Sequence, residues 1–138
     1  SPHGWYIGNM DEPMKQAAAV FERFPEVKLA YLFGSRAKNK AGPMSDYDFA
    51  VSLAGESKEK MGDLRLKVAA ELCRALKTDA VDVVVFELAE SPELKYNIIK
   101  ESAPLFAREP YKVLIEPKIL TEYFDFRAVL RRHHLTRA

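Results

Sequence analysis

The stretch YLFGSRAKNKAGPMSDYDFAV, residues 31–51, decides the fold. Its apolar run stops at Gly34-Ser35, and after ten further residues Asp46 and Asp48 stand one residue apart in a second strand-like run. Aromatic and branched residues that alternate with other types indicate strands, which we expect over 27–33 and 46–53.

The strand predicted over 46–53 has two different faces, because successive side chains point to opposite sides of a sheet. One face carries Asp46 and Asp48, and it continues with small residues, Ala50 and Ser52. The other face is predicted to form the core, and it carries Tyr47, Phe49, Val51 and Leu53.

A third strand, predicted over 80–86, repeats this pattern with Asp82. Asp82 lies on the opposite face from Val81, Val83 and Val85. If this strand neighbours the strand at 46–53, the three aspartates converge on one patch. Three adjacent carboxylates repel one another, so they must take up protons or bind a cation. Hard oxygen ligands without histidine or cysteine favour Mg²⁺, with Mn²⁺ as the second choice.

Gly34-Ser35 provides the second half of the predicted site. A glycine at the end of a strand lets the backbone turn sharply and approach a ligand. The backbone N–H groups of this turn, with the Ser35 hydroxyl, can bind phosphate oxygens. Arg36 and Lys38 would add positive charge next to them.

The remaining elements follow from caps, breakers and periodicity. We expect a helix that begins at Asp11-Glu12-Pro13 and ends before Pro25, and a longer helix with Ser57 as its cap. A short helix is predicted from Ser91-Pro92 to about residue 100, then an edge strand over 103–107 and a last helix that starts at Pro117. This order predicts a small α/β or α+β domain with one mixed sheet flanked by helices.

The length and composition of the chain limit the kinds of function to consider. The 138 residues suit one domain, which we expect over 11–138 with the core motifs in 27–86, and residues 1–10 are expected to be disordered or a processed or cloning-derived end. The net charge of +1 gives no reason to expect direct nucleic-acid binding. A single cysteine, Cys73, favours a reducing cytoplasm, and no apolar run has the length of about 20 residues that spans a bilayer.

LFGSRA, SDYDFAV and VDVVVF together resemble the nucleotidyltransferase superfamily related to DNA polymerase β. The short chain is similar to the minimal nucleotidyltransferases (MNT). The resemblance implies that Asp46, Asp48 and Asp82 hold two metal ions and are catalytic, and that Gly34 and Ser35 bind the β- and γ-phosphates of ATP. It also implies in-line attack of an acceptor hydroxyl on the α-phosphorus. The spacer departs from the usual pattern at Lys38-Asn39-Lys40.

The resemblance implies a partner as well. Minimal nucleotidyltransferases pair with helical HEPN ribonuclease toxins, transfer AMP to a toxin tyrosine and act as antitoxins. We expect that role here, with the aromatic C-terminal helix forming part core and part interface in a hetero-oligomer. Two alternatives stay open: modification of a small molecule, and inhibition of the toxin by contact without catalysis.

Overall fold

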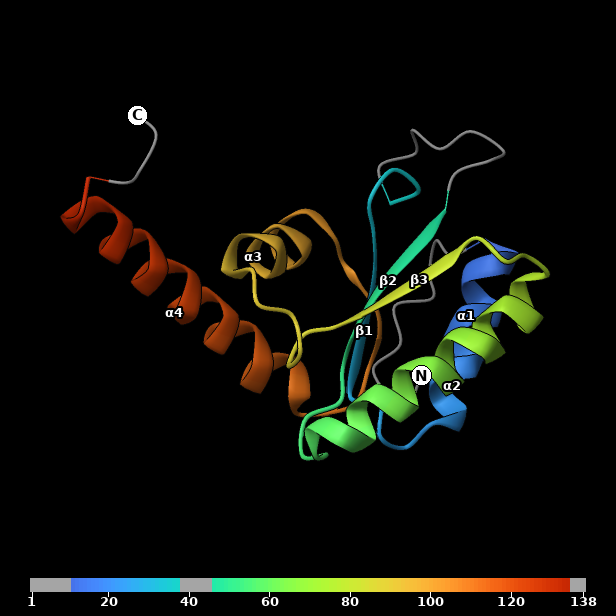
Figure 1. Ribbon diagram of the computed structural model, residues 1–138. Coiled ribbons are helices and arrows are strands. Elements are labelled where there is room, and N and C mark those ends of the chain that lie inside the picture. The colour runs from blue at the N-terminus through green and yellow to red at the C-terminus, as the bar shows by residue number, and fades with distance from the viewer. Residues whose placement is uncertain (1–10, 38–45, 135–138) are drawn as a thin grey trace.

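The computed structural model describes residues 11–37 and 46–134. It contains one four-stranded sheet with the strand order β3-β2-β1-β4. β1 pairs antiparallel with both β2 and β4, whereas β2 and β3 are parallel (Figure 1). The strands are β1 (Leu29–Phe33), β2 (Tyr47–Ser52), β3 (Val81–Val85) and β4 (Pro104–Ala107). The predicted mixed sheet is confirmed, and so is the edge position of its fourth strand.

Two helices cover one face of the sheet, α1 (Glu12–Arg23) and α2 (Lys58–Leu76) (Figure 1). Asp11 and Ser57 cap them as predicted, because each side chain accepts a hydrogen bond from a backbone N–H of the first turn. The core on this side contains apolar residues of β2, Leu53 directly after it, and apolar residues along one face of α2. Its members include Phe49, Val51, Leu53, Met61, Leu64, Val68 and Leu72.

The opposite face carries a second core beneath α3 (Pro92–Glu101) and α4 (Tyr111–Arg132). Tyr31 and Ala50 from the sheet are fully buried there, against Ile98 of α3 and Ile115 and Ile119 of α4. The face of β2 that carries the aspartates is therefore apolar and covered over part of its length. In Figure 1 the C-terminal half of α4 extends away from the sheet.

The predicted start of the last helix at Pro117 is wrong, since α4 begins at Tyr111 and Pro117 lies inside it. A proline within a helix removes one backbone hydrogen bond and costs about 3 kcal/mol. Ile115 and Ile119 are buried on either side of Pro117, so their packing holds the helix together through this position. Among the described residues, no helix is long and apolar enough to span a membrane.

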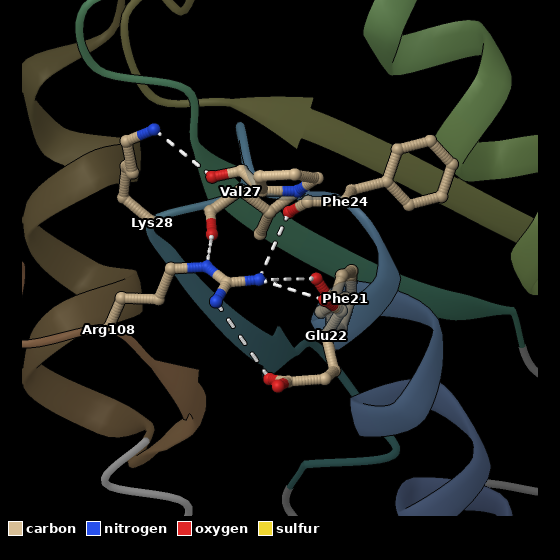
Figure 2. A network of polar contacts seen from close by, with 7 residues as sticks. Phe21, Glu22, Phe24, Val27, Lys28 and Arg108 are labelled. Atoms are coloured by element: carbon tan, nitrogen blue, oxygen red, sulfur yellow. Dashed lines mark hydrogen bonds and ion pairs between the residues drawn. The ribbon is translucent and has the colours of Figure 1, made fainter. Parts of the chain in front are cut away.

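Arg108 joins the end of β4 to the C-terminal end of α1 (Figure 2). Its guanidinium donates hydrogen bonds to the carbonyl oxygens of Glu22 at 2.9 Å and Phe24 at 3.3 Å, and its Nε donates to that of Val27 at 3.0 Å. Helix C-terminal carbonyls have no partner within the helix and carry partial negative charge, so a cation is stabilising there.

Candidate active site

The acidic patch lies at one end of the sheet face that carries the second core. Across the parallel pair β2–β3, Asp48 stands opposite Asp82, and Ala50 stands opposite Val84 in the row below. Asp46 precedes β2 and is two residues from Asp48, so alternation puts it on the same side. The three predicted aspartates therefore share one end of one face.

Solvent reaches the carboxylates at this end of the face. Ala50 is fully buried, Asp48 is half-buried, and both Asp46 and Asp82 are exposed. Asp48 of β2 and Asp82 of β3 thus lie next to an apolar core and remain accessible to a ligand.

Burial raises the pKa of Asp48, and the negative charges of Asp82 and Asp46 raise it further. Both causes disfavour the charged carboxylate. A cation bound beside Asp48 would relieve the repulsion, so the electrostatics of the patch favour a positively charged ligand.

The donor set fits a hard divalent cation, because it contains carboxylate oxygens and no sulfur or imidazole. Asp46, Asp48 and Asp82 are the residues that would hold such an ion. In residues 11–37 and 46–134, no three His, Cys, Asp or Glu side chains are arranged as a ready-made metal-ligand set.

Gly34 lies beside Asp48 immediately after β1. Phe33, the last residue of β1, pairs with Asp48 across the antiparallel β1–β2 ladder. Gly34 has a φ of +77°, and a Cβ added to it would lie 2.5 Å from Oδ2 of Asp48. Only glycine allows this backbone conformation and this close approach together. The Gly34–Ser35 turn, with Ser35 exposed, therefore adjoins the carboxylates.

The Arg36 side chain contacts the ring of Tyr47, the residue between Asp46 and Asp48. Its guanidinium carbon is 3.9 Å from the centroid of the Tyr47 ring, a cation–π contact. The Tyr47 side chain packs against the core on the α1 and α2 side, opposite to Asp48. The contact between Arg36 and Tyr47 was not predicted from the sequence. Lys38, also predicted to bind phosphate, lies outside the described residues.

Comparisons with known proteins agree with this architecture. The family described as "Polymerase beta, Nucleotidyltransferase" matches residues 15–111. A search of curated proteins found no match.

Several solved structures are similar to this chain. A chain of a toxin–antitoxin complex with AMP-PNP is 25% identical, with a TM-score of 0.71 over 86% of this chain and 93% of that one. A chain of a mutant MntA–HpeT toxin–antitoxin complex has the same TM-score and coverage at 23% identity. A chain of the complex of tri-AMPylated HEPN toxin with MNT antitoxin from Shewanella oneidensis is 24% identical, with a TM-score of 0.63 over 87% of this chain and 91% of that one.

The predicted resemblance to nucleotidyltransferases is confirmed, because the family match spans more than half of the 138 residues. The fold of the similar structures supports the same assignment. The chain belongs to the polymerase β family of nucleotidyltransferases.

Proposed function

We propose that this nucleotidyltransferase moves AMP from ATP to a tyrosine hydroxyl of a HEPN ribonuclease toxin, and so acts as the antitoxin. The observation that carries the proposal is the placement of Asp48 opposite Asp82 with the Gly34 backbone alongside. Carboxylates on neighbouring strands next to an open glycine turn are suited to a nucleotide and its metal ions.

Each residue has a role in the proposed reaction. Gly34 and Ser35 bind the β- and γ-phosphates through backbone N–H groups and the serine hydroxyl. Asp46, Asp48 and Asp82 would hold two Mg²⁺ ions, which supply Lewis-acid stabilisation of the charge that develops on the phosphate. Asp82 accepts the proton of the acceptor hydroxyl. The acceptor oxygen then bonds to the α-phosphorus as the bond to the leaving pyrophosphate breaks.

The accessibility of the site favours a large acceptor. Asp46 and Asp82 are exposed, so a tyrosine carried on another protein can approach the patch without passing through a narrow channel. A small acceptor would normally need a concave pocket that surrounds most of its surface. The open patch therefore favours a protein substrate over a small molecule.

The similar structures support the same partner. The 25% identical chain belongs to a toxin–antitoxin complex with AMP-PNP, an ATP analogue. The complex from Shewanella oneidensis contains a tri-AMPylated HEPN toxin with its MNT antitoxin. The reaction proposed here is the one that would leave such a product on a cognate toxin.

The test is to incubate the chain with a purified HEPN protein encoded beside it, Mg²⁺ and ATP labelled at the α-phosphate. We expect label on one or more toxin tyrosines and loss of ribonuclease activity. The double variant Asp46→Asn/Asp48→Asn should transfer no label, whereas Asp63→Asn, on the exposed surface of α2, should transfer normally. Equal labelling by the double variant would overturn the proposed site. Toxin neutralisation by that variant without labelling would show inhibition by contact.

A further inference from the structure

A chain of stacked side chains connects the Gly34–Ser35 turn to helix α1. The guanidinium of Arg36 lies 3.9 Å from the Tyr47 ring centroid, and the Tyr47 ring stacks nearly parallel to that of Phe49 at 6.2 Å. Phe49 in turn meets Phe21 of α1 edge to face at 5.6 Å. Phe21 and Phe49 are fully buried, so the far end of this chain is fixed in the core.

Arg36 contacts Tyr47, whose side chain lies on the opposite face of β2 from the Asp48 side chain. Tyr47 and Phe49 face the core beneath α1 and α2, whereas Asp48 faces the other way. The contact with Tyr47 thus draws the arginine side chain toward the α1 side of the sheet. A guanidinium stacked on an aromatic face is favourable, and more so where water is partly excluded.

We propose that Arg36 and Tyr47 are positioning residues that fix the Gly34–Ser35 turn for nucleotide binding. Arg36 follows Gly34 by two residues, so holding its side chain limits the conformations open to the turn. Gly34 needs such a restraint, because glycine adopts many backbone conformations and its φ of +77° is only one of them. The inference rests on the proposed role of this turn as the phosphate site.

The competing interpretation, suggested by the sequence, is that Arg36 binds phosphate directly. The two roles predict different effects of Arg36 on nucleotide binding when the Tyr47 ring is removed. A direct phosphate ligand would act independently of the Tyr47 ring. A positioning arginine would lose its effect as soon as the ring is removed.

The test is a double-mutant cycle on the equilibrium dissociation constant for ATP with Mg²⁺, measured by calorimetry without any toxin. We expect Arg36→Ala and Tyr47→Leu each to weaken binding about two- to tenfold, the range of a cation–π contact. The double variant should be no weaker than either single variant, because residues that act through one contact are not additive. Tyr47→Phe keeps the aromatic face and should bind nearly as the wild type does. Arg23→Ala removes an arginine from an exposed ion pair with Glu71 and is the matched control.

Two outcomes of the cycle would overturn the proposal and make Arg36 a direct ligand. One is additive losses of affinity. The other is unchanged binding in Tyr47→Leu together with a loss of about 10- to 100-fold in Arg36→Ala.

A second measurement needs no nucleotide. The ¹⁵N heteronuclear NOE of the Gly34 amide should fall in Arg36→Ala and Tyr47→Leu and stay unchanged in Tyr47→Phe. An unchanged NOE in all three variants would also contradict the inference. Failure of AMP transfer to a toxin, with ATP binding intact, would overturn the proposed function and leave this inference standing.

Discussion

Gly34 and Asp48 share a space that holds only one side chain, because a Cβ at Gly34 would lie 2.5 Å from Oδ2 of Asp48. We predict that Gly34→Ala displaces the carboxylate and lowers kcat/KM for AMP transfer by about 100-fold, the usual effect of moving a reacting group by about 1 Å. The positive φ adds a backbone penalty of about 1–2 kcal/mol, which thermal unfolding would measure.

Gly55 provides the matched control for this substitution. It also has a positive φ, +95°, but a Cβ there would meet nothing within 4 Å. Gly55→Ala should therefore lower the free energy of unfolding by a similar amount and leave the transfer rate intact. If both variants lost activity equally, backbone strain alone would explain the result and the contact with Asp48 would be irrelevant.

Asp48→Asn should stabilise the metal-free protein while abolishing transfer. The pKa of Asp48 is raised by burial and by Asp82 and Asp46, so the folded-state pKa lies above that of the unfolded chain. The ionised carboxylate therefore disfavours the folded state at neutral pH, and this penalty disappears as the pH falls through the folded-state pKa.

Urea denaturation of the wild type and Asp48→Asn at several pH values would measure this effect. The stability advantage of Asp48→Asn should be greatest near neutral pH and shrink toward acid. Saturating Mg²⁺ should reduce it as well, since a cation stabilises the charged form. A difference that is independent of pH would show that the Asp48 carboxylate carries no such penalty. Transfer should fall by more than about 100-fold, the upper effect of removing a second-shell partner of a metal ligand.

The sequence predicts the placement of the aspartates on the sheet better than it predicts what surrounds them. Asp46, Asp48 and Asp82 follow strand alternation, and both Asp11 and Ser57 cap helices through contacts three residues away, so local patterns suffice for them. The second core is less visible, because Ala50 looks like part of an open face until α3 and α4 cover it. The contact between Arg36 and Tyr47 joins residues separated by a long spacer, which no periodicity reveals.

The same limit explains the error at the last helix. α4 starts after Pro110, without a side-chain cap, and Pro117 is a stronger local signal of a helix start than anything at Tyr111. Only the packing of Ile115 and Ile119 against the sheet shows that the helix passes through the proline.

Arg108 should contribute to stability and not to catalysis. Its side chain is only 20% exposed and donates hydrogen bonds to carbonyls at the end of α1, which would lose this charged donor if it were removed. We expect Arg108→Ala to lower the free energy of unfolding by about 2–4 kcal/mol, because hydrogen bonds to charged groups are worth more than neutral ones. Chemical denaturation measures this loss, and ATP binding below the melting temperature should be unchanged.

Two further variants sharpen the interpretation of Arg108. Arg108→Lys keeps the charge but offers a compact ammonium in place of the planar guanidinium, so it should recover only part of the loss. Arg74→Ala removes an exposed arginine paired with Glu71 and should change stability by less than about 0.5 kcal/mol. Full recovery of the free energy of unfolding in Arg108→Lys would mean that the positive charge alone, and not the hydrogen bonds of the guanidinium, stabilises the end of α1.

Lys95 and Glu122 join α3 to α4 through an ion pair of 2.7 Å whose two sides differ in exposure. Lys95 is buried with 7% of its surface exposed, whereas the Glu122 side chain is 46% exposed.

Glu122→Ala leaves a buried ammonium without its counterion, and we expect it to lower the free energy of unfolding by about 1–3 kcal/mol. Lys95→Met leaves a carboxylate that water can solvate and places an apolar chain in a buried position, so it should cost less than about 1 kcal/mol. Urea denaturation of both variants measures the difference. Equal losses of unfolding free energy in the two variants would contradict this expectation. They would show that the attraction between the two charges, and not the solvation of the buried lysine, determines the contribution of this ion pair to the packing of α4 on α3.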